Sequence, residues 1–167
     1  GPTQYAAQLE GSKAFAKDFL ARHDIPTAYY QVFTDADEAL AYVRSKGAPI
    51  VIKADGLAAG KGVTVAQSLD EAKEALEAIF LKNQFGEAGH KVVIEDFLVG
   101  EEASILAFTD GDTIVQMPAA QDHKAIFDGD KGPNTGGMGT YSPAPVVTEQ
   151  VVEKVQTRIL EPLLKGL

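Results

Sequence analysis

The chain has 167 residues and a formal net charge of −9, because 24 aspartate and glutamate residues outnumber 15 lysine and arginine residues. Hydrophobic residues make up 45% of the chain and charged residues 23%, which is typical of a folded globular protein and excludes disorder as its main state. The acidic charge argues against nucleic acid and anionic membrane surfaces as partners, and the lack of cysteine excludes disulfides and thiolate chemistry and fits a cytoplasmic location.

The first part of the chain predicts a helix, an extended segment and a second helix. Apolar residues recur at helical spacing over residues 11–20, and Pro26 lies beyond the end of that helix. A short extended run follows over residues 28–33. Thr34 is a candidate N-cap for the next helix, and Gly47 is its natural stop.

The next segment predicts two strands joined by a glycine-rich loop. Residues 49–53 form a compact β-branched run, typical of a buried strand, and a second β-rich run covers residues 63–65. The loop between them occupies residues 55–62. Ser68 and Glu71 then have the spacing of a capping box, which predicts the start of an amphipathic helix.

The remaining sequence predicts mainly antiparallel strands. Residues 91–98 and 103–108 have the composition of strands, and an Asp-Gly turn connects the second of these to a strand at residues 113–115. We expect a long loop over residues 119–148, which is unusual in a compact domain unless it has a function. A helix is predicted after Thr148.

The glycine-rich loop suggests phosphate binding but fits neither common phosphate-binding motif. A P-loop has four residues between its glycines and a hydroxyl after its lysine, whereas three residues separate Gly56 from Gly60, and Gly62 follows Lys61. The dinucleotide fingerprint fails because the loop leads into a strand instead of a helix. One interpretation is a flap whose backbone N–H groups approach phosphate oxygens, with Lys53 or Lys61 supplying positive charge. The other is a plain glycine hairpin.

Two further groups of polar residues are candidates for binding small molecules. Three glutamates, Glu95, Glu101 and Glu102, flank a strand end and its turn, where carboxylates can accept hydrogen bonds from ribose hydroxyls. A solvated acidic face is the simpler explanation. In the expected long loop, Asp122, His123 and Asn134 are suited to a small polar substrate. A histidine that only bonds its own loop is the alternative there.

Five segments, in order and over almost the whole chain, resemble the phosphoribosylamine–glycine ligases, also called glycinamide ribonucleotide synthetases, of the ATP-grasp superfamily. They are residues 8–13, 52–63, 100–104, 121–124 and 132–143. The resemblance implies an α+β fold, in which an ATP-grasp small lobe with an antiparallel sheet and helices is joined to part of the central lobe. Residues 26–101 would form the small lobe, and residues 1–25 and 102–167 would belong to the central lobe.

The same resemblance implies a reaction of de novo purine biosynthesis. In this family, ATP phosphorylates the carboxylate of glycine, and the amine of 5-phosphoribosylamine attacks the glycyl phosphate. The implied nucleotide site consists of two lysines, a glycine flap, an adenine-reading hinge and a ribose-binding carboxylate: Lys13, Lys53, Gly56, Gly60, Lys61, Gly62, Glu95, Phe97, Leu98 and Glu102. The implied substrate side consists of Asp122, His123, Lys124, Asn134, Gly136, Gly137 and Met138.

The resemblance also implies parts that lie outside this sequence. We expect a further domain before Gly1 and, beyond Leu167, a strand whose side chains hold the Mg²⁺ or Mn²⁺ that accompanies ATP. Because phosphoryl transfer relies on such ions, we expect this internal segment alone to lack synthetase activity. Two other interpretations stay open: a stand-alone adenine-nucleotide-binding module without catalysis, and another ATP-grasp ligase that joins a carboxylate to an amine.

Overall fold

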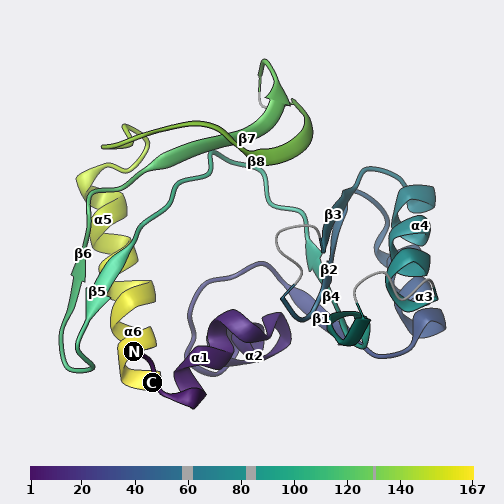
Figure 1. The fold of residues 1–167 in the computed structure, drawn as a ribbon, viewed down its shortest axis with the longest axis horizontal. Helices are drawn as coiled ribbons and strands as arrows, with labels where there is room; N and C mark the ends of the chain where they lie inside the picture. The colour runs from purple at the N-terminus through teal and green to yellow at the C-terminus, as the bar shows by residue number, and fades with distance from the viewer. Residues whose placement is uncertain (58–61, 82–85, 130) are drawn as a thin grey trace. The chain divides into compact units, whose positions relative to one another are not determined.

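The computed structural model describes residues 1–57, 62–81, 86–129 and 131–167. The chain divides into two compact units, Gly1–Leu98 and Val99–Leu167, which are described one at a time. Figure 1 shows the course of the chain through both units. Among the described residues, no helix is long and apolar enough to cross a membrane.

The first unit contains four helices, four strands and a 3₁₀ turn among its described residues. In chain order they are α1 (Gln4–Gly11), α2 (Lys13–Arg22), β1 (Tyr30–Phe33), α3 (Ala36–Lys46), β2 (Ile50–Ala54), β3 (Val63–Ala66), α4 (Leu69–Phe80), the 3₁₀ turn η1 (Gly86–Gly89) and β4 (Val92–Asp96). The strands form one antiparallel sheet in the order β1-β4-β2-β3. β4 and β2 are therefore the inner strands, with a paired neighbour on each side.

One face of this sheet carries the apolar core. Along β2 every second residue is buried, and Ile50, Ile52 and Ala54 join the core cluster with α3 and α4, which lie together beside the sheet in Figure 1. α4 contributes an apolar stripe at helical spacing that includes Leu76 and Ile79. Burial of each large aliphatic side chain stabilises the unit by roughly 1.5–3 kcal/mol.

The opposite face of β4 is buried as well, but it carries a charge. Val92 and Ile94 belong to the core cluster, so the alternation of a strand turns Val93 and Glu95 to the other face. Both of these residues are buried, and α2 packs against β4. This second face is therefore where charged side chains of α2, β2 and β4 can meet.

The second unit consists of two β-hairpins and a helical segment. β5 (Ala107–Thr109) pairs with β6 (Ile114–Gln116), and β7 (Gln121–Phe127) pairs with β8 (Lys131–Tyr141) with register irregularities on either side of Ala125. The helical segment contains α5 (Glu149–Val155), the π-helical η2 (Gln156–Leu160) and α6 (Glu161–Gly166). It is the yellow segment in Figure 1.

Several predictions from the sequence are confirmed, including the α+β class. β2 and β3 form the expected antiparallel pair around the glycine-rich loop, of which residues 58–61 lie outside the described residues. Ser68 caps α4 by accepting a hydrogen bond from the Glu71 N–H at 3.2 Å, and the Glu71 carboxylate accepts one from the Gln67 N–H at 2.8 Å. The helix expected after Thr148 is present as α5, and Thr148 is its N-cap.

Two helix starts differ from the prediction. Asp35, and not Thr34, is the N-cap of α3, because its carboxylate accepts hydrogen bonds from the N–H groups of Asp37 and Glu38, both at 2.9 Å. The helical pattern at residues 11–20 is also divided. Ser12 has extended backbone angles, ends α1 and caps α2, so an additional helix precedes the predicted one.

The predictions for two segments of the second unit are wrong in part. The expected loop over residues 119–148 contains the β7–β8 hairpin, because its many glycines and prolines conceal the alternation on which strand prediction depends. The strand expected at residues 103–108 begins only at Ala107. Ser104 instead forms an isolated bridge with Ala120.

Candidate functional site

A pocket of about 400 Å³ lies in the first unit, lined by residues of α1, α2, β2, β3 and β4. Lys13, Lys17 and Lys53 line it together with Glu10, Glu95 and several aliphatic side chains. The chain as a whole is acidic, with a net charge of −9, so three ammonium groups at one pocket are a local concentration of positive charge. The pocket therefore suits an anionic ligand.

A buried carboxylate lies between two of these lysines. Glu95 is 6% exposed, and its Oε2 lies 2.8 Å from Lys17 Nζ while its Oε1 lies 2.8 Å from Lys53 Nζ. Among the described residues, no donor meets Oε1 with hydrogen-bond geometry, so its contact with Lys53 is an ion pair without a directed hydrogen bond. One carboxylate thus faces two ammonium groups, which leaves one positive charge in excess.

Strand register helps to bring together this triad of charged residues, Lys17, Lys53 and Glu95. In the β2–β4 pair, Lys53 lies opposite Val93 and Glu95 lies opposite Val51. Lys53 and Glu95 are therefore diagonal neighbours on one face of the sheet, within reach of long side chains. Lys17 reaches the same carboxylate from α2, the helix that packs against β4.

Lys13 is held beside the start of the glycine-rich loop. Its Nζ donates hydrogen bonds to the carbonyl oxygens of Gly56 at 2.9 Å and Asp55 at 3.3 Å. Burial lowers the pKa of Lys13 from its usual value; the charge of Asp55 opposes this shift and that of Lys53 adds to it. Because the carbonyl partners are uncharged, the ammonium of Lys13 can still attract an anion.

The described ends of the glycine-rich loop lie at the pocket. Gly62 lines it, and the Gly62 carbonyl accepts a hydrogen bond of 2.8 Å from the Ala54 N–H at the end of β2. Gly56 is bonded to Lys13 as described above. Gly60 and Lys61, both expected to contact phosphate, lie outside the described residues.

The predicted adenine hinge is only partly at the pocket. Glu95 lines it with its side chain, whereas Phe97 and Leu98 directly follow β4 and are not among the lining residues. Phe97 is 38% exposed and Leu98 69% exposed. Their role as an adenine hinge stays a prediction.

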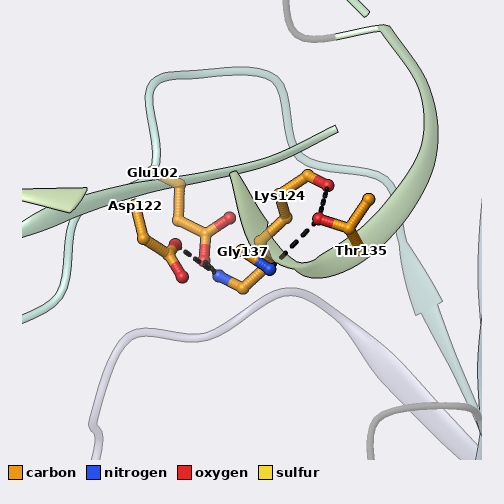
Figure 2. A network of polar contacts seen from close by, with 5 residues as sticks. All are labelled: Glu102, Asp122, Lys124, Thr135 and Gly137. Carbon is orange, nitrogen blue, oxygen red and sulfur yellow. Dashed lines mark hydrogen bonds and ion pairs between the residues drawn. The ribbon is translucent and has the colours of Figure 1, made fainter. Parts of the chain in front are cut away.

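In the second unit, Lys124 joins two carboxylates (Figure 2). Its Nζ donates hydrogen bonds to Asp122 Oδ1 and Glu102 Oε1, each 2.7 Å long. These bonds, first that of Asp122 and then that of Glu102, raise the pKa of Lys124 above its usual value. Thr135 Oγ1 donates to the Lys124 carbonyl at 3.0 Å and accepts from the Gly137 N–H at 3.1 Å. A polar network thus ties β7 to β8.

The other predicted substrate-side residues lie on the same hairpin. His123 and Met138 line a second pocket of about 250 Å³. Gly136 and Asn134 belong to β8. The fold therefore gathers the predicted substrate side on β7 and β8, while the described nucleotide-site residues other than Glu102 belong to the first unit.

Comparison with known families identifies the architecture. Residues 11–167 match the sequence profile of the phosphoribosylglycinamide synthetase ATP-grasp (A) domain. The chain belongs to this family. Phosphoribosylamine–glycine ligases from Yersinia pestis and Xanthomonas campestris pv. campestris are 62% and 64% identical to it over 167 residues, which are 100% of this chain and 39% of each relative. The chain thus spans well under half the length of these relatives.

Solved structures agree with the family assignment. The crystal structure of phosphoribosylamine–glycine ligase from Thermotoga maritima is 39% identical, with a TM-score of 0.81 over 99% of this chain and 42% of that chain. D-alanyl-alanine synthetase A from Vibrio cholerae is 18% identical, with a TM-score of 0.70 over 95% of this chain and 49% of that chain. The second likeness concerns the fold alone.

ATP-grasp proteins bind ATP and typically a divalent metal ion with it. In the part of this ATP-grasp domain that the structure describes, no three or more histidine, cysteine, aspartate or glutamate side chains are grouped to hold a metal ion. We therefore assign no metal ligand among the described residues.

Several lining residues of the pocket of this ATP-grasp domain were not predicted from the sequence, and Lys17 is the one that adds a positive charge. A signal was present, because Lys13 and Lys17 are four residues apart in a helical pattern and must share a helix face. The position of Glu95 between Lys17 and Lys53 had no such signal, since it depends on which strands pair and in which register.

Proposed function

We propose that this chain is the nucleotide-binding portion of a phosphoribosylamine–glycine ligase. The γ-phosphoryl group of ATP passes to a carboxylate oxygen of glycine, which gives glycyl phosphate and ADP. The amine nitrogen of 5-phosphoribosylamine attacks the carbonyl carbon, the bond from that carbon to the phosphate oxygen breaks, and glycinamide ribonucleotide and inorganic phosphate are released. The family match and the names of the relatives support this proposal.

The observation that carries the proposal is the convergence of Lys13 and Lys53 on one pocket. Phosphoryl transfer spreads negative charge over the phosphate oxygens, and cations fixed in advance around them stabilise the transition state. Lys13 bonds to carbonyl oxygens and Lys53 shares its carboxylate with a second lysine, so both retain attraction for an anion. We assign this pocket to the phosphates of ATP.

The remaining roles follow the family resemblance and are proposals. Adenine binds at the hinge of Glu95, Phe97 and Leu98, and the ribose hydroxyls bind to Glu102. The glycine flap keeps water from the acyl phosphate, through Gly56, Gly60, Lys61 and Gly62. The substrate side is formed by Asp122, His123, Lys124, Asn134, Gly136, Gly137 and Met138.

The proposal extends to the organisation of the whole enzyme. Residues 26–101 form the small lobe, which is supported by the inclusion of all four strands of the first unit's sheet in that range. Residues 1–25 and 102–167 contribute to the central lobe, and Mg²⁺ or Mn²⁺ is held by residues of the enzyme beyond Leu167. The absence of cysteine supports a cytoplasmic location.

The test uses the full-length product of the gene that encodes this chain. We expect release of ADP from MgATP to require glycine, and glycinamide ribonucleotide to form when 5-phosphoribosylamine is also present. ADP release with a different carboxylic acid but not with glycine would indicate another ligase, and nucleotide binding without ADP release would indicate a binding module. The 167-residue chain alone is expected to form no glycinamide ribonucleotide.

A further inference from the structure

Lys17 is a buried cation whose partners are fixed. Its Nζ donates a hydrogen bond of 2.6 Å to Thr27 Oγ1, lies 2.8 Å from Glu95 Oε2, and lies 5.8 Å from the centroid of the Tyr30 ring. Its side chain is 11% exposed, compared with 25% for Lys53. Lys17 is thus held in place on several sides, whereas Lys53 is more open to the pocket.

Neutralising Glu95 does not require Lys17. Lys53 already lies 2.8 Å from Oε1, and one ammonium balances the charge of one carboxylate. Burial of a second ammonium costs free energy, and buried ion pairs are often no more stabilising than apolar side chains of the same size. A role in stability alone therefore accounts poorly for this lysine.

We propose that Lys17 is a positioning residue of the nucleotide pocket, which pairs with Glu95 so that the charge of Lys53 stays available to the phosphates of ATP. This inference rests on the proposed function. The contact of Lys53 with Oε1 lacks hydrogen-bond geometry, so a phosphate oxygen can replace Oε1 at the Lys53 ammonium. Lys17 keeps the buried carboxylate paired during that exchange.

The inference can be tested by removing first the charge of Lys17 and then also the charge of Glu95, because the second substitution should compensate for the first. In Lys17→Met, Glu95 has only Lys53 as its counter-ion in the triad, and phosphate must compete with a buried carboxylate for that ammonium. In the double variant Lys17→Met/Glu95→Gln, the competing carboxylate is removed and Lys53 is released again. A purely structural role of Lys17 predicts the opposite order, because the double variant loses more of the native contacts.

The experiment measures dissociation constants for MgATP and for adenosine by calorimetry on the full-length gene product, without glycine or 5-phosphoribosylamine. The variants are Lys17→Met, the double variant, and Lys73→Met as a control. Lys73 is an exposed residue of α4, so its substitution changes the net charge equally but away from the pocket. Circular dichroism and thermal melting establish that each variant is folded.

We expect Lys17→Met to weaken MgATP binding about tenfold or more, while adenosine binding and the Lys73→Met control stay within about twofold of wild type. The double variant should recover to within about threefold of wild type. Unchanged MgATP binding in Lys17→Met, or a double variant no better than Lys17→Met, would overturn the inference while leaving the proposed function intact. Failure of the wild-type protein to bind MgATP would overturn both.

A further variant covers the case in which Lys17→Met does not fold. Glu95→Gln alone removes the carboxylate that holds Lys53, so MgATP should bind more tightly than to wild type. Weaker MgATP binding by a folded Glu95→Gln protein, with adenosine binding unchanged, would contradict the proposed role of the triad.

Discussion

Asp55 Oδ1 accepts a hydrogen bond of 2.7 Å from the backbone N–H of Ala14. Asp55 directly follows β2, and Ala14 lies in the first turn of α2. The same carboxylate accepts a hydrogen bond from Ser12 Oγ at 3.0 Å, and a negative charge at a helix N-terminus interacts favourably with the helix dipole. One side chain thereby fixes the strand that carries Lys53 against the helix that carries Lys13.

Replacement of Asp55 by alanine is expected to destabilise the first unit. The variant loses an acceptor for the Ala14 N–H and a charge near the start of α2, so the free energy of unfolding should fall by about 1–3 kcal/mol. Urea unfolding followed by circular dichroism measures the change. Asp55→Asn keeps an acceptor and should lose less, whereas the exposed Asp112→Ala should change little. Equal stability of wild type and Asp55→Ala would show that this tie is not stabilising.

Lys13→Ala and Lys53→Ala are each expected to weaken MgATP binding, because each removes one cation from the pocket. A loss of roughly 10- to 100-fold is expected for a charge that contacts phosphate in a partly desolvated site. Calorimetric titration gives the dissociation constants. Lys73→Ala, which removes an exposed surface ion pair with Glu77, serves as the control. If all three variants bind MgATP alike, the pocket is not the phosphate site.

The N-cap of α3 can be tested against the neighbouring residue. Asp35→Ala removes the acceptor for two N–H groups at the start of the helix and should cost about 1 kcal/mol of stability. Thr34→Ala should change the free energy of unfolding by less than about 0.5 kcal/mol, since Thr34 is not the cap. Urea midpoints of the two variants give the comparison, and a larger loss in Thr34→Ala would contradict the cap assignment.

We expect the ionisation of Tyr30 to lower the free energy of unfolding at high pH. Burial, together with the hydrogen bond of 2.6 Å that Tyr30 donates to Asp18 Oδ1, raises the pKa of Tyr30 to about 12. An unfolded tyrosine has a pKa of about 10, so between these values the folded chain keeps a proton that the unfolded chain releases. The contribution of this group is complete below about pH 10 and is lost as the pH rises towards 12.

Tyr30→Phe isolates this effect from the other groups that titrate at high pH. The difference in free energy of unfolding between wild type and Tyr30→Phe should become smaller as the pH increases from about 9 to about 11. Urea unfolding at several pH values in this range measures it. A difference that does not vary with pH would mean that Tyr30 has the same pKa in the folded and unfolded chains.

The sequence could predict those parts of the site that depend on local pattern. Lys53 stands in a β-branched run before a glycine-rich loop, and this segment forms the expected strand pair. The pairing of Glu95 with Lys53 could not be predicted, because it results from the antiparallel register of two strands that are distant in the chain. The second unit shows another limit: the β7–β8 hairpin is held by contacts between strands, such as the Thr135 bond to Lys124, and has no alternating apolar pattern.

The two buried faces of β4 link correct folding to ligand binding. A slip of one residue in the pairing of β4 would turn Glu95 towards the apolar cluster and Ile94 towards the lysines, since adjacent side chains of a strand point to opposite faces. Such a misregistered chain would bury an unpaired carboxylate among hydrocarbon side chains and lose the counter-ion of Lys17 and Lys53. Misregistration of β4 therefore destabilises the chain in two ways. A chain in which the lysine pocket has formed must also have β4 in its native register.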